Sequence, residues 1–488
     1  MTVERIDEET PLLTTDHDNN VQVLKQRRTP TPLPKVQISI LMLLQLCEPI
    51  LSQSIYPYIN QLISELDITG GDERRVGYYA GIIESLFYAT EAMTVLQWSR
   101  ASDTIGRKPI LLIGVAGSMI SMLLFGLSTT FWALVVSRCL TGLLNGNIGI
   151  MKSTIADLTD PTNRAEGISM IPAVWSFGAT MGPLIGGTFA KPHERFPNVF
   201  TSPFWRAYPY FLPCLVGVSY VFVAFTIAAV AFKETLPKKR RRSRKLSRDY
   251  SSGSEITVTS TYQEGPIPLR ELITYPVVLT VSNYAVLAFL NIAFNALFPL
   301  FLAMPLDIGG LGLPPSTIGY IMGAYGAATG LFQFFWFAKI IRALGERLVV
   351  LIGTGALPAM FIILPIISLI ARNCGVNALV WMMIVLVEML AVLMDTAYGG
   401  IFLYLTTSPP SRSALGATNG LSQTTVSISR AIGPVMSTSL FSLSVQKNWL
   451  GGYAVYLFFA VLSLGSVALA RLLPEGLWEE AEAEVEDD

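Results

Sequence analysis

Twelve long apolar segments restrict what this chain can fold into more than any other feature of its sequence. Each holds about 20 or more mostly apolar residues, the length at which a helix crosses the hydrocarbon core of a bilayer. The composition agrees, because 51% of the 488 residues are hydrophobic and only 14% are charged, against roughly 25% in soluble domains. The sequence therefore predicts an all-α membrane protein with twelve transmembrane helices. The predicted spans are approximately 37–63, 76–99, 109–128, 131–152, 167–190, 208–232, 274–304, 314–338, 347–371, 376–406, 413–444 and 451–473.

A polar segment separates the first six spans from the last six. It reads KETLPKKRRRSRKLSRDYSSGSEITVTSTYQEG, which is rich in basic residues and serine and too poor in apolar residues to form a core of its own. We therefore expect five regions along the chain. They are a disordered cytoplasmic N-terminal tail (1–35), an N-terminal six-helix half (36–232), a basic cytoplasmic linker (233–272), a C-terminal six-helix half (273–473) and an acidic cytoplasmic tail (474–488).

Lysine and arginine predict the orientation, since the cytoplasmic loops of membrane proteins carry an excess of both. With both termini in the cytoplasm, the inner loops hold nineteen basic residues and the outer loops hold seven. The densest cluster, KKRRRSRK, then remains in the cytoplasm. We expect a multi-pass protein of the plasma membrane or the vacuolar membrane. EETPLL, at residues 8–13, has the form of an acidic dileucine sorting signal, a pattern short enough to arise by chance.

The two sets of six spans repeat each other. GRKPILLIG follows the second span and GERLVVLIG follows the eighth, and a tryptophan precedes each, Trp98 and Trp336. A Gly-Pro pair occurs in the fifth span, at Gly182–Pro183, and again in the eleventh, at Gly433–Pro434. Two parallel six-helix pseudo-repeats that meet at a central cavity are a transporter architecture.

The loop SDTIGRKPILL resembles the motif between the second and third spans of the major facilitator superfamily, whose fold has twelve helices in two six-helix halves. Two positions depart from the family pattern, because Ser99 stands where glycine is usual and Thr104 where a basic residue is common. The resemblance implies that this loop gates the cytoplasmic side. The residues that fill its acidic, glycine and basic positions are Asp103, Gly106, Arg107 and Lys108.

The fifth span carries a second motif of that family. FGATMGPLIGG is similar to GxxxGPxxGG, which in the family accompanies proton-coupled efflux antiporters with twelve spans; Ser169 stands where the longer form has a further glycine. RCLTGLLNG resembles the fourth-span motif, which begins with an arginine, here Arg138. The overall layout looks closest to the zinc-induced facilitator-like branch, beside the multidrug and tetracycline exporters. The fifth-span motif is filled by Gly178, Gly182, Pro183, Gly186 and Gly187.

Glycines three and four residues apart let neighbouring helices approach closely, because lipid provides no hydrophobic force between helices. Pro183 removes one backbone hydrogen bond and kinks the span. We expect this helix to pack against a helix of the other half and to act as a seal or pivot. Ordinary tight packing, without such a role, is the alternative.

Several ionisable residues lie inside predicted spans, where each costs roughly 2.5–3.5 kcal/mol on insertion scales. Glu84 and Glu91 are seven residues apart, so they share one helix face; Glu388 and Asp395 repeat that spacing. A carboxylate stripe beside a cavity can hold a proton or a cation, and burial and a nearby arginine act on its protonation in opposite directions. A structural ion pair is the alternative for Glu91. We predict proton coupling by Glu48, Glu84, Glu91 and Arg138.

Other polar residues inside the spans are candidates for the wall of a substrate cavity. Their alternative role is interhelical hydrogen bonding, which is common for such residues in membranes. The candidates are Gln45, Asn145, Asn291, Asn295, Glu388, Asp395, Asn419, Gln423 and Arg430.

The sequence offers no signal for a metal site or a bound cofactor. Its four cysteines and two histidines are scattered, and no phosphate-binding glycine loop is evident. We expect a secondary active transporter, not an enzyme, that exports a small organic solute or drug in exchange for protons by alternating access. Its expected partners are that solute, protons and the bilayer, without nucleic acid, and we expect a monomer. The alternatives are a proton-independent uniporter or symporter, a carrier of a hard metal cation, and a transporter-like receptor.

Overall fold

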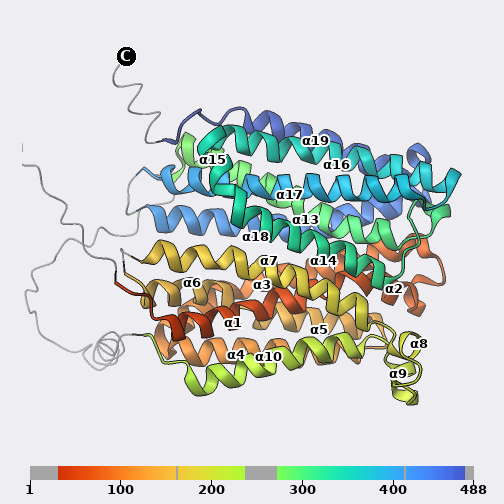
Figure 1. The fold of residues 1–488 in the computed structure, drawn as a ribbon, viewed down its shortest axis with the longest axis horizontal. Coiled ribbons are helices and arrows are strands. Elements are labelled where there is room, and N and C mark those ends of the chain that lie inside the picture. Colours follow the sequence, from red (N-terminus) through yellow and green to blue (C-terminus); the bar gives the residue numbers. More distant parts are fainter. Residues whose placement is uncertain (1–30, 161–162, 237–271, 411–413, 479–488) are drawn as a thin grey trace, which may run out of the picture.

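The computed structural model describes residues 31–160, 163–236, 272–410 and 414–478 (Figure 1). Within these ranges every regular element is a helix and none is a strand, which confirms the predicted all-α class. The dileucine pattern, most of the basic linker and most of the acidic tail lie outside the described residues.

The first six predicted spans coincide with helices α1 to α10, which we call the N-terminal group. α1 and α2 together form the first span, α5 and α6 form the fourth, and α8 and α9 are short helices between the fifth and sixth. The bounds are α1 Lys35–Gln53, α2 Tyr56–Ser64, α3 Val76–Ile105, α4 Arg107–Gly126, α5 Phe131–Leu144, α6 Asn147–Leu158, α7 Arg164–Phe189, α8 Pro192–Arg195, α9 Pro203–Ala207 and α10 Phe211–Ala231.

The last six predicted spans coincide with helices α13 to α19, the C-terminal group. A π-helical turn at Gln333–Phe337 joins α14 to α15 within the eighth span. The bounds are α13 Tyr275–Ala303, α14 Pro315–Phe332, α15 Ala338–Leu344, α16 Glu346–Cys374, α17 Ala378–Thr407, α18 Leu415–Gln446 and α19 Ala454–Ala470.

Helix polarity separates the bundle into two kinds of span. In the described residues, seven helical spans are long and apolar enough to cross a membrane by length and composition alone. α3, α7, α14 and α18 are not among the seven, because glycine, hydroxyl and ionisable residues interrupt their apolar character. These four helices are the ones that pack between the two groups, so they are not surrounded by lipid on all sides.

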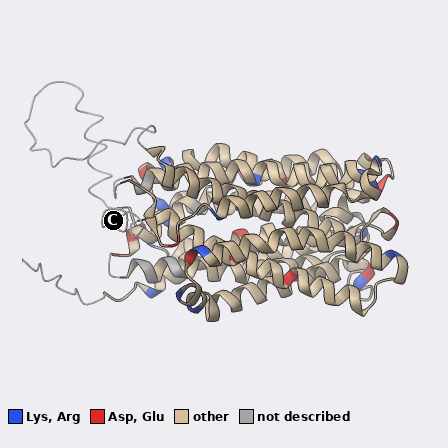
Figure 2. Cartoon of the chain, turned by 90° about the horizontal axis from the view of Figure 1, so that it is seen from above, with Lys and Arg blue, Asp and Glu red and all other residues tan. Residues whose placement is uncertain are grey.

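The helices run side by side, and the bundle has two different ends (Figure 1). We call the end at which α1 begins and α19 ends the terminal end, and the end that carries α8 and α9 the loop end. Figure 2 shows Lys, Arg, Asp and Glu mainly at these two ends, with few along the length of the bundle. This is the distribution expected when lipid surrounds the middle of the helices.

α7 and α14 join the two groups in the half of the bundle nearer the loop end. A Cβ atom on Gly187 would lie 2.9 Å from the Cα of Gly319, and one on Gly326 would lie 2.6 Å from the backbone carbonyl carbon of Ala179. Real Cβ atoms do not come this close to backbone atoms. Glycine is therefore required at these positions for the two helices to approach as they do.

α3 and α18 form the second contact between the groups, also near the loop end. A Cβ atom on Gly81 would lie 2.8 Å from the Cα of Val435. The backbone amide of Val435 donates a hydrogen bond of 2.9 Å to the Ser85 hydroxyl, which is possible because Pro434 interrupts the regular pattern of α18.

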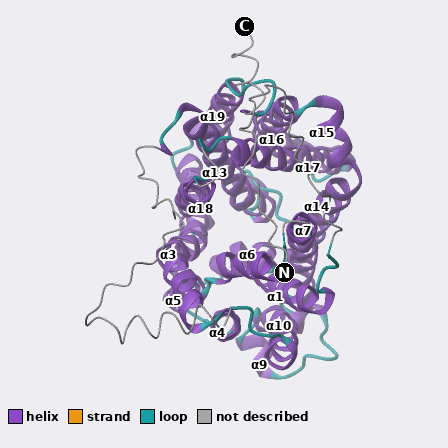
Figure 3. Cartoon of the chain, turned by 90° about the vertical axis from the view of Figure 1, so that its left-hand side faces the viewer, coloured by secondary structure: helices purple, strands orange, loops and turns teal. Residues whose placement is uncertain are grey.

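Toward the terminal end the same helix faces no longer meet. Leu96, on the face of α3 that carries Ser85, is 61% exposed, and Ile428, on the matching face of α18, is 54% exposed. In the π-helical turn that follows α14, Phe334 is 78% exposed. The two groups are thus closed against each other at the loop end and apart at the terminal end. Figure 3 views the bundle from the terminal end, with α3, α7, α14 and α18 between the two groups.

Gly319→Leu tests whether backbone-to-backbone packing holds the loop end closed. The leucine would push against α7, and overpacking a tight contact costs about 1–3 kcal/mol or more. We expect a lower midpoint of thermal unfolding in detergent. Gly355→Leu is the matched control, because a Cβ atom at Gly355 of α16 would meet nothing within 4 Å. Equal midpoints for the two variants would contradict the packing argument.

Candidate functional site

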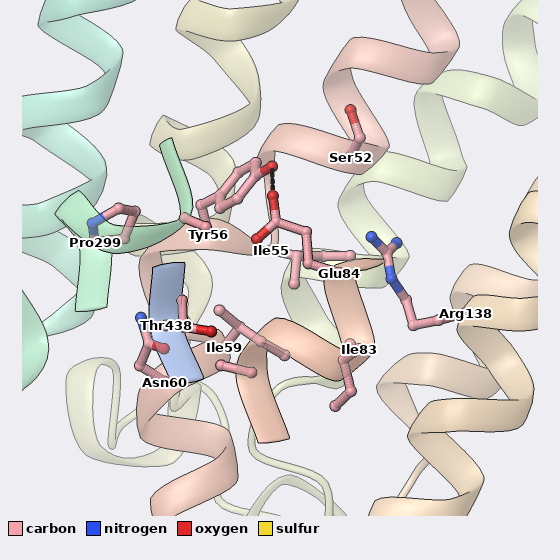
Figure 4. A pocket seen from close by; sticks show the side chains of 12 residues that line it. Ser52, Ile55, Tyr56, Ile59, Asn60, Ile83, Glu84, Arg138, Pro299 and Thr438 are labelled. Carbon is pink, nitrogen blue, oxygen red and sulfur yellow. Dashed lines mark hydrogen bonds between the residues drawn. The ribbon is translucent and has the colours of Figure 1, made fainter. Parts of the chain in front are cut away.

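Glu84, on α3, lies in a small pocket between the two groups. Tyr56, the first residue of α2, donates its hydroxyl hydrogen to a Glu84 carboxylate oxygen (Figure 4). The pocket has a volume of about 20 Å³, which is room for a water molecule and too little for an organic solute. Ala296, Pro299 and Thr438 of the C-terminal group complete its lining. A change in the charge of Glu84 would therefore alter the electrostatic interactions at the contact between the groups.

Arg138, on α5, lies on the other side of the same pocket (Figure 4). It is only 6% exposed, and its Nε atom makes no hydrogen bond to the described residues. The guanidinium carbon lies 4.9 Å from the ring centre of Phe87 and 5.9 Å from that of Phe125, so the faces of two aromatic rings stabilise the charge. The charge of Arg138 also acts on Glu84, although no salt bridge within 4 Å joins Arg138 to a carboxylate in the described part of the chain.

Asn145 brings Glu91 and Glu48 together. Its side-chain nitrogen donates a hydrogen bond of 3.1 Å to a Glu91 carboxylate oxygen, and its side chain also interacts with Glu48 of α1. Asn145 is non-helical and ends α5, because the fourth span breaks there and resumes at Asn147. The break directs an amide into the space between α1 and α3, so that two carboxylates share one neutral donor.

Arg430, on α18, faces these two carboxylates from the C-terminal group. α3 and α18 run antiparallel, and Ser85 meets Val435. Arg430 precedes Val435 by five residues, so it stands level with the turn of α3 that carries Glu91. Its charge acts on Glu48 and Glu91, yet it forms no hydrogen bond or salt bridge within the described residues.

The fifth-span glycines connect this cluster to the contact between the groups. Cβ atoms on Gly178 and Gly182 would lie 2.5 Å from the side chain of Pro49 and 2.8 Å from that of Gln53, both on α1. Gly186 also faces α1, and of the motif glycines only Gly187 faces α14. The motif thus packs mainly within its own group, next to the turn that carries Glu48, and reaches the other half through a different face of α7.

The acidic residues of the tenth span form a separate cluster. The Tyr325 hydroxyl on α14 donates a 2.6 Å hydrogen bond to an Asp395 carboxylate oxygen, and the Thr329 hydroxyl donates one of 3.3 Å to the same oxygen. Glu388 lies two turns away on α17 and its charge interacts with Asp395. Among the described residues, no hydrogen bond or salt bridge joins this pair to the carboxylates of the N-terminal group, so the two repeated carboxylate pairs do not form one shared site.

The remaining cavity candidates are dispersed. Asn295 donates a 3.3 Å hydrogen bond to Asn291, so this pair is linked along α13. Gln423 interacts with Tyr284 and Asn419 is exposed, and both lie on α18 nearer the terminal end than Arg430. Gln45 is buried on α1.

The motif that follows the second span is held together at the terminal end. Arg107 forms salt bridges of 2.8 Å with Asp103 and 3.2 Å with Asp157 of α6. The Lys108 ammonium donates hydrogen bonds to the carbonyl oxygens of Ala229 and Phe232 at the end of α10. In this conformation the motif therefore binds α4, α6 and α10 of its own group to one another.

Glu234 is a site residue that sequence reasoning missed. Its carboxylate accepts hydrogen bonds from the backbone amides of Arg107, at 2.8 Å, and Lys108, at 3.2 Å. The negative charge of Glu234 thus accepts hydrogen bonds from two amides of the first turn of α4 and lies at the positive end of that helix's dipole, which stabilises the start of the helix. A Cβ atom on Gly106, whose φ is +131°, would lie 2.5 Å from that carboxylate, which explains the glycine of the motif.

The C-terminal group has a related contact at the corresponding place. Glu475, which follows α19, forms a 3.1 Å salt bridge with the side chain of Arg347, the second residue of α16. In each group, a glutamate that follows the last span thus contacts the first turn of that group's third span. The repeat GRKPILLIG and GERLVVLIG could have indicated this partner, but only the fold brings the two glutamates to it.

Two salt bridges within the N-terminal group and a hydrogen bond to the C-terminal group lie at the loop end. Lys191 pairs with Glu65 at 2.6 Å and with Glu194 at 3.4 Å, and Arg195 donates a 2.8 Å hydrogen bond to the Tyr320 hydroxyl of α14. Burial lowers the pKa of the Lys191 ammonium, but the hydrogen bond and charge of Glu65 outweigh this, so its pKa lies above the ordinary value.

No group of three or more His, Cys, Asp or Glu side chains in the described ranges is close enough to hold a metal ion. The arrangement offers instead half-buried carboxylates, of which Glu48, Glu84, Glu91 and Asp395 have a hydroxyl or amide donor, and two arginines without a directly contacting carboxylate among the described residues. Such groups can take up and release protons and can bind charged groups of a solute.

The comparison with protein families decides which class of protein carries this site. The model of the Major Facilitator Superfamily matches residues 41–434. The chain belongs to this superfamily. It is therefore a membrane transporter and not an enzyme, as predicted, and its fold is the major facilitator fold.

Individual members of the superfamily support this membership over nearly the whole chain. The major facilitator-type transporter psiT2 of Psilocybe cyanescens is 32% identical over 481 residues, 91% of each chain. The multidrug transporter mfsB of Aspergillus fumigatus is 28% identical over 92% of this chain and 84% of its own length. The protein ZINC INDUCED FACILITATOR-LIKE 1 of Arabidopsis thaliana is 27% identical over 91% of this chain and 93% of its own, which bears out the resemblance to that branch.

Solved structures agree on the fold. A bacterial homologue of the human lysosomal transporter Spinster, in an inward-facing and occupied conformation, superposes with a TM-score of 0.66 over 91% of this chain and 97% of that chain. The two sequences are 15% identical, so this likeness concerns the fold alone.

Glu234→Ala tests the cap on α4. Loss of the carboxylate leaves two amides of the first turn without an acceptor, which costs about 1 kcal/mol, so the midpoint of thermal unfolding should fall. Glu346→Ala is the matched control, because Glu346 also begins a helix, α16, but accepts no hydrogen bond from a described residue. If the unfolding midpoint falls equally in both variants, the carboxylate of Glu234 does not stabilise the start of α4 in the way described.

Glu65→Gln tests the salt bridge of Lys191. A group whose pKa is raised on folding adds stability below its unfolded pKa and loses it as the pH rises through its folded pKa. The difference in unfolding midpoint between wild type and variant should therefore be constant from about pH 7 to 9 and shrink only above the ordinary lysine value of about 10.4. Glu73→Gln, in a neighbouring exposed turn, controls for loss of one carboxylate. A difference that vanishes between pH 7 and 9 would contradict this account.

Proposed function

We propose that the chain exports a small organic solute in exchange for protons by alternating access, with the terminal end in the cytoplasm. The observation that carries this proposal is the position of Glu48, Glu84 and Glu91. All three lie on helices of the N-terminal group. Glu84 lines the pocket at the contact between the groups, and Glu48 and Glu91 lie level with Arg430 of the C-terminal group. The basic residues predicted to stay in the cytoplasm support the orientation.

The first proton would be held by Glu84. In the closed loop end, the Tyr56 hydroxyl and the charge of Arg138 stabilise the carboxylate. Protonation would remove its attraction to Arg138 and leave that buried guanidinium without a counter-charge. Because Pro299 and Thr438 of the other group line the same pocket, this loss would weaken the closed contact and favour opening of the loop end.

The second proton would be held by the pair Glu48 and Glu91, which Asn145 bridges. Two like charges in one cluster repel each other, so such a pair readily retains one proton. Gly178 packs against Pro49, the neighbour of Glu48, and the opposite face of α7 packs against α14. A shift of α1 on proton release would thus act on the second contact between the groups.

The fifth-span motif and the relatives support export over import. The motif resembles that of proton-coupled efflux antiporters, and the relative from Aspergillus fumigatus is called a multidrug transporter. Alternating access needs two conformations that are open at opposite ends. Closed at the loop end and separated at the terminal end, the described conformation would receive solute from the cytoplasm.

Proton flux in proteoliposomes tests this proposal. Purified protein is reconstituted with a pH-sensitive dye inside, and organic cations and zwitterions are added singly. We expect solute-dependent proton movement in wild type, and a loss of at least tenfold in Glu48→Gln and in Glu84→Gln. Glu73→Gln is the matched control, since this exposed glutamate lies outside the site, and it should transport as wild type does.

The same assay separates the alternatives. Solute movement without proton movement in wild type would contradict antiport and leave a uniporter or a symporter of another ion. Proton movement that persists in both variants would show that these carboxylates do not couple it. A receptor would bind solute and move neither solute nor protons.

A further inference from the structure

We infer that the solute is a small aromatic zwitterion, an organic ammonium that also carries an acidic group, and that it bridges Glu48 and Glu91 of one group and Arg430 of the other. This inference rests on the proposed function, because it names the substrate class of the same site. It follows from the signs of the charges on the two walls and from the lack of a direct contact between these charges among the described residues.

The wall formed by the N-terminal group is acidic. Glu48 and Glu91 converge on Asn145, whose amide is 3% exposed and donates to Glu91. One amide cannot neutralise two carboxylates. An ammonium group, which has three donors and a positive charge, matches what this pair lacks.

The wall formed by the C-terminal group is basic at the same depth. Arg430 stands level with Glu91 and donates no hydrogen bond within the described residues. Lys152, exposed on α6 of the N-terminal group, is near enough for its charge to act on that of Arg430 and adds a second positive charge on this side of the carboxylates. A guanidinium takes a carboxylate or phosphate group through two parallel hydrogen bonds, so Arg430 is suited to an acidic group that the described residues do not supply.

No direct contact joins the charged groups of the two walls within the described residues. Arg430 acts electrostatically on Glu48 and Glu91 but lies beyond the 4 Å of a salt bridge to either. Three tyrosines lie near enough to act electrostatically on it, Tyr88 from α3, Tyr284 from α13 and Tyr398 from α17. The Tyr284 and Tyr398 rings meet edge to face with centres 6.1 Å apart. Aromatic walls between the two charged ends fit an aromatic skeleton.

Singly charged solutes fit less well. A cation would satisfy the carboxylates but would bring its charge near Arg430 and Lys152, and an anion would meet the carboxylates in the same way. A zwitterion places each of its charges against the opposite sign and adds no net charge to a cavity inside the membrane. It also contacts both groups at once, which is what links binding to their relative movement.

Matched compounds test the inference by equilibrium binding. Isothermal titration calorimetry on the full chain in lipid nanodiscs at pH 7.5 compares three forms of phenylalanine, tyrosine and naphthylalanine. The free amino acid carries both charges, the carboxamide carries only the ammonium, and the N-acetyl form carries only the carboxylate. We expect the free amino acid of at least one skeleton to bind at least tenfold more tightly than both of its singly charged forms.

Variants assign each end of the ligand. In Arg430→Gln, the affinity for the free amino acid should fall to that for its carboxamide, and the affinity for the carboxamide should not change. In Glu91→Gln, the affinity for the free amino acid should fall toward that for the N-acetyl form. Lys447→Gln removes a positive charge from the exposed end of the same helix and should change neither. The inference is overturned if the carboxamide or N-acetyl form binds as tightly as the free amino acid, or if no skeleton shows the preference.

Binding and coupling fail separately. Zwitterion preference without proton flux in the proteoliposome assay would overturn the proposed antiport and leave the substrate class intact. Proton flux driven by organic cations, with no preference for zwitterions, would overturn the substrate class and leave antiport intact.

Discussion

Close backbone packing between the two groups at the loop end is the interaction on which the rest of this structure depends. Lipid does not drive helices together, so α7 and α14, and α3 and α18, associate through van der Waals contact of small residues. Gly187 against Gly319 and Gly81 against Val435 bring backbones together at distances that no larger residue permits. This contact encloses the Glu84 pocket and sets the position of Arg430 on α18 relative to Glu91 on α3. At the terminal end the two groups remain apart.

The buried charges follow from that arrangement. An ionisable residue at the centre of a span costs roughly 2.5–3.5 kcal/mol, and the described residues offset only part of this. Tyr56 and Asn145 each supply a donor to a carboxylate, while Phe87 and Phe125 stabilise Arg138 through their ring faces. Within the part of the chain that the structure describes, Arg138 and Arg430 still lack a direct carboxylate partner. Groups left incomplete in this way, beside a contact that must open, are suited to exchange protons and solute.

Much of the fold could be predicted from the sequence, because hydropathy and the Gly-Pro repeat are local patterns. The break at Asn145 could not be predicted, because nothing in RCLTGLLNG indicates that the helix ends there. The break lies next to Gly142, where α3 packs closely against α5. The glycines from Gly319 to Gly330 in the eighth span lie three and four residues apart, a spacing similar to that of the fifth span, so the sequence contained this signal for close packing. The partners Tyr56 and Glu234 were beyond sequence reasoning, because tertiary structure alone brings them to Glu84 and to the start of α4.

The most direct test of the central claim, that protonation of the N-terminal carboxylates shifts the balance between the two ends, is a distance measurement. Spin labels on Gln97 of α3 and Asn419 of α18, both exposed near the terminal end, report how far apart the groups stand there. Double electron–electron resonance between pH 5 and pH 8 should show two populations whose ratio changes with pH in wild type and is fixed in the double variant Glu48→Gln, Glu84→Gln. A ratio that is the same at every pH in wild type, or that still changes with pH in the double variant, would contradict the account.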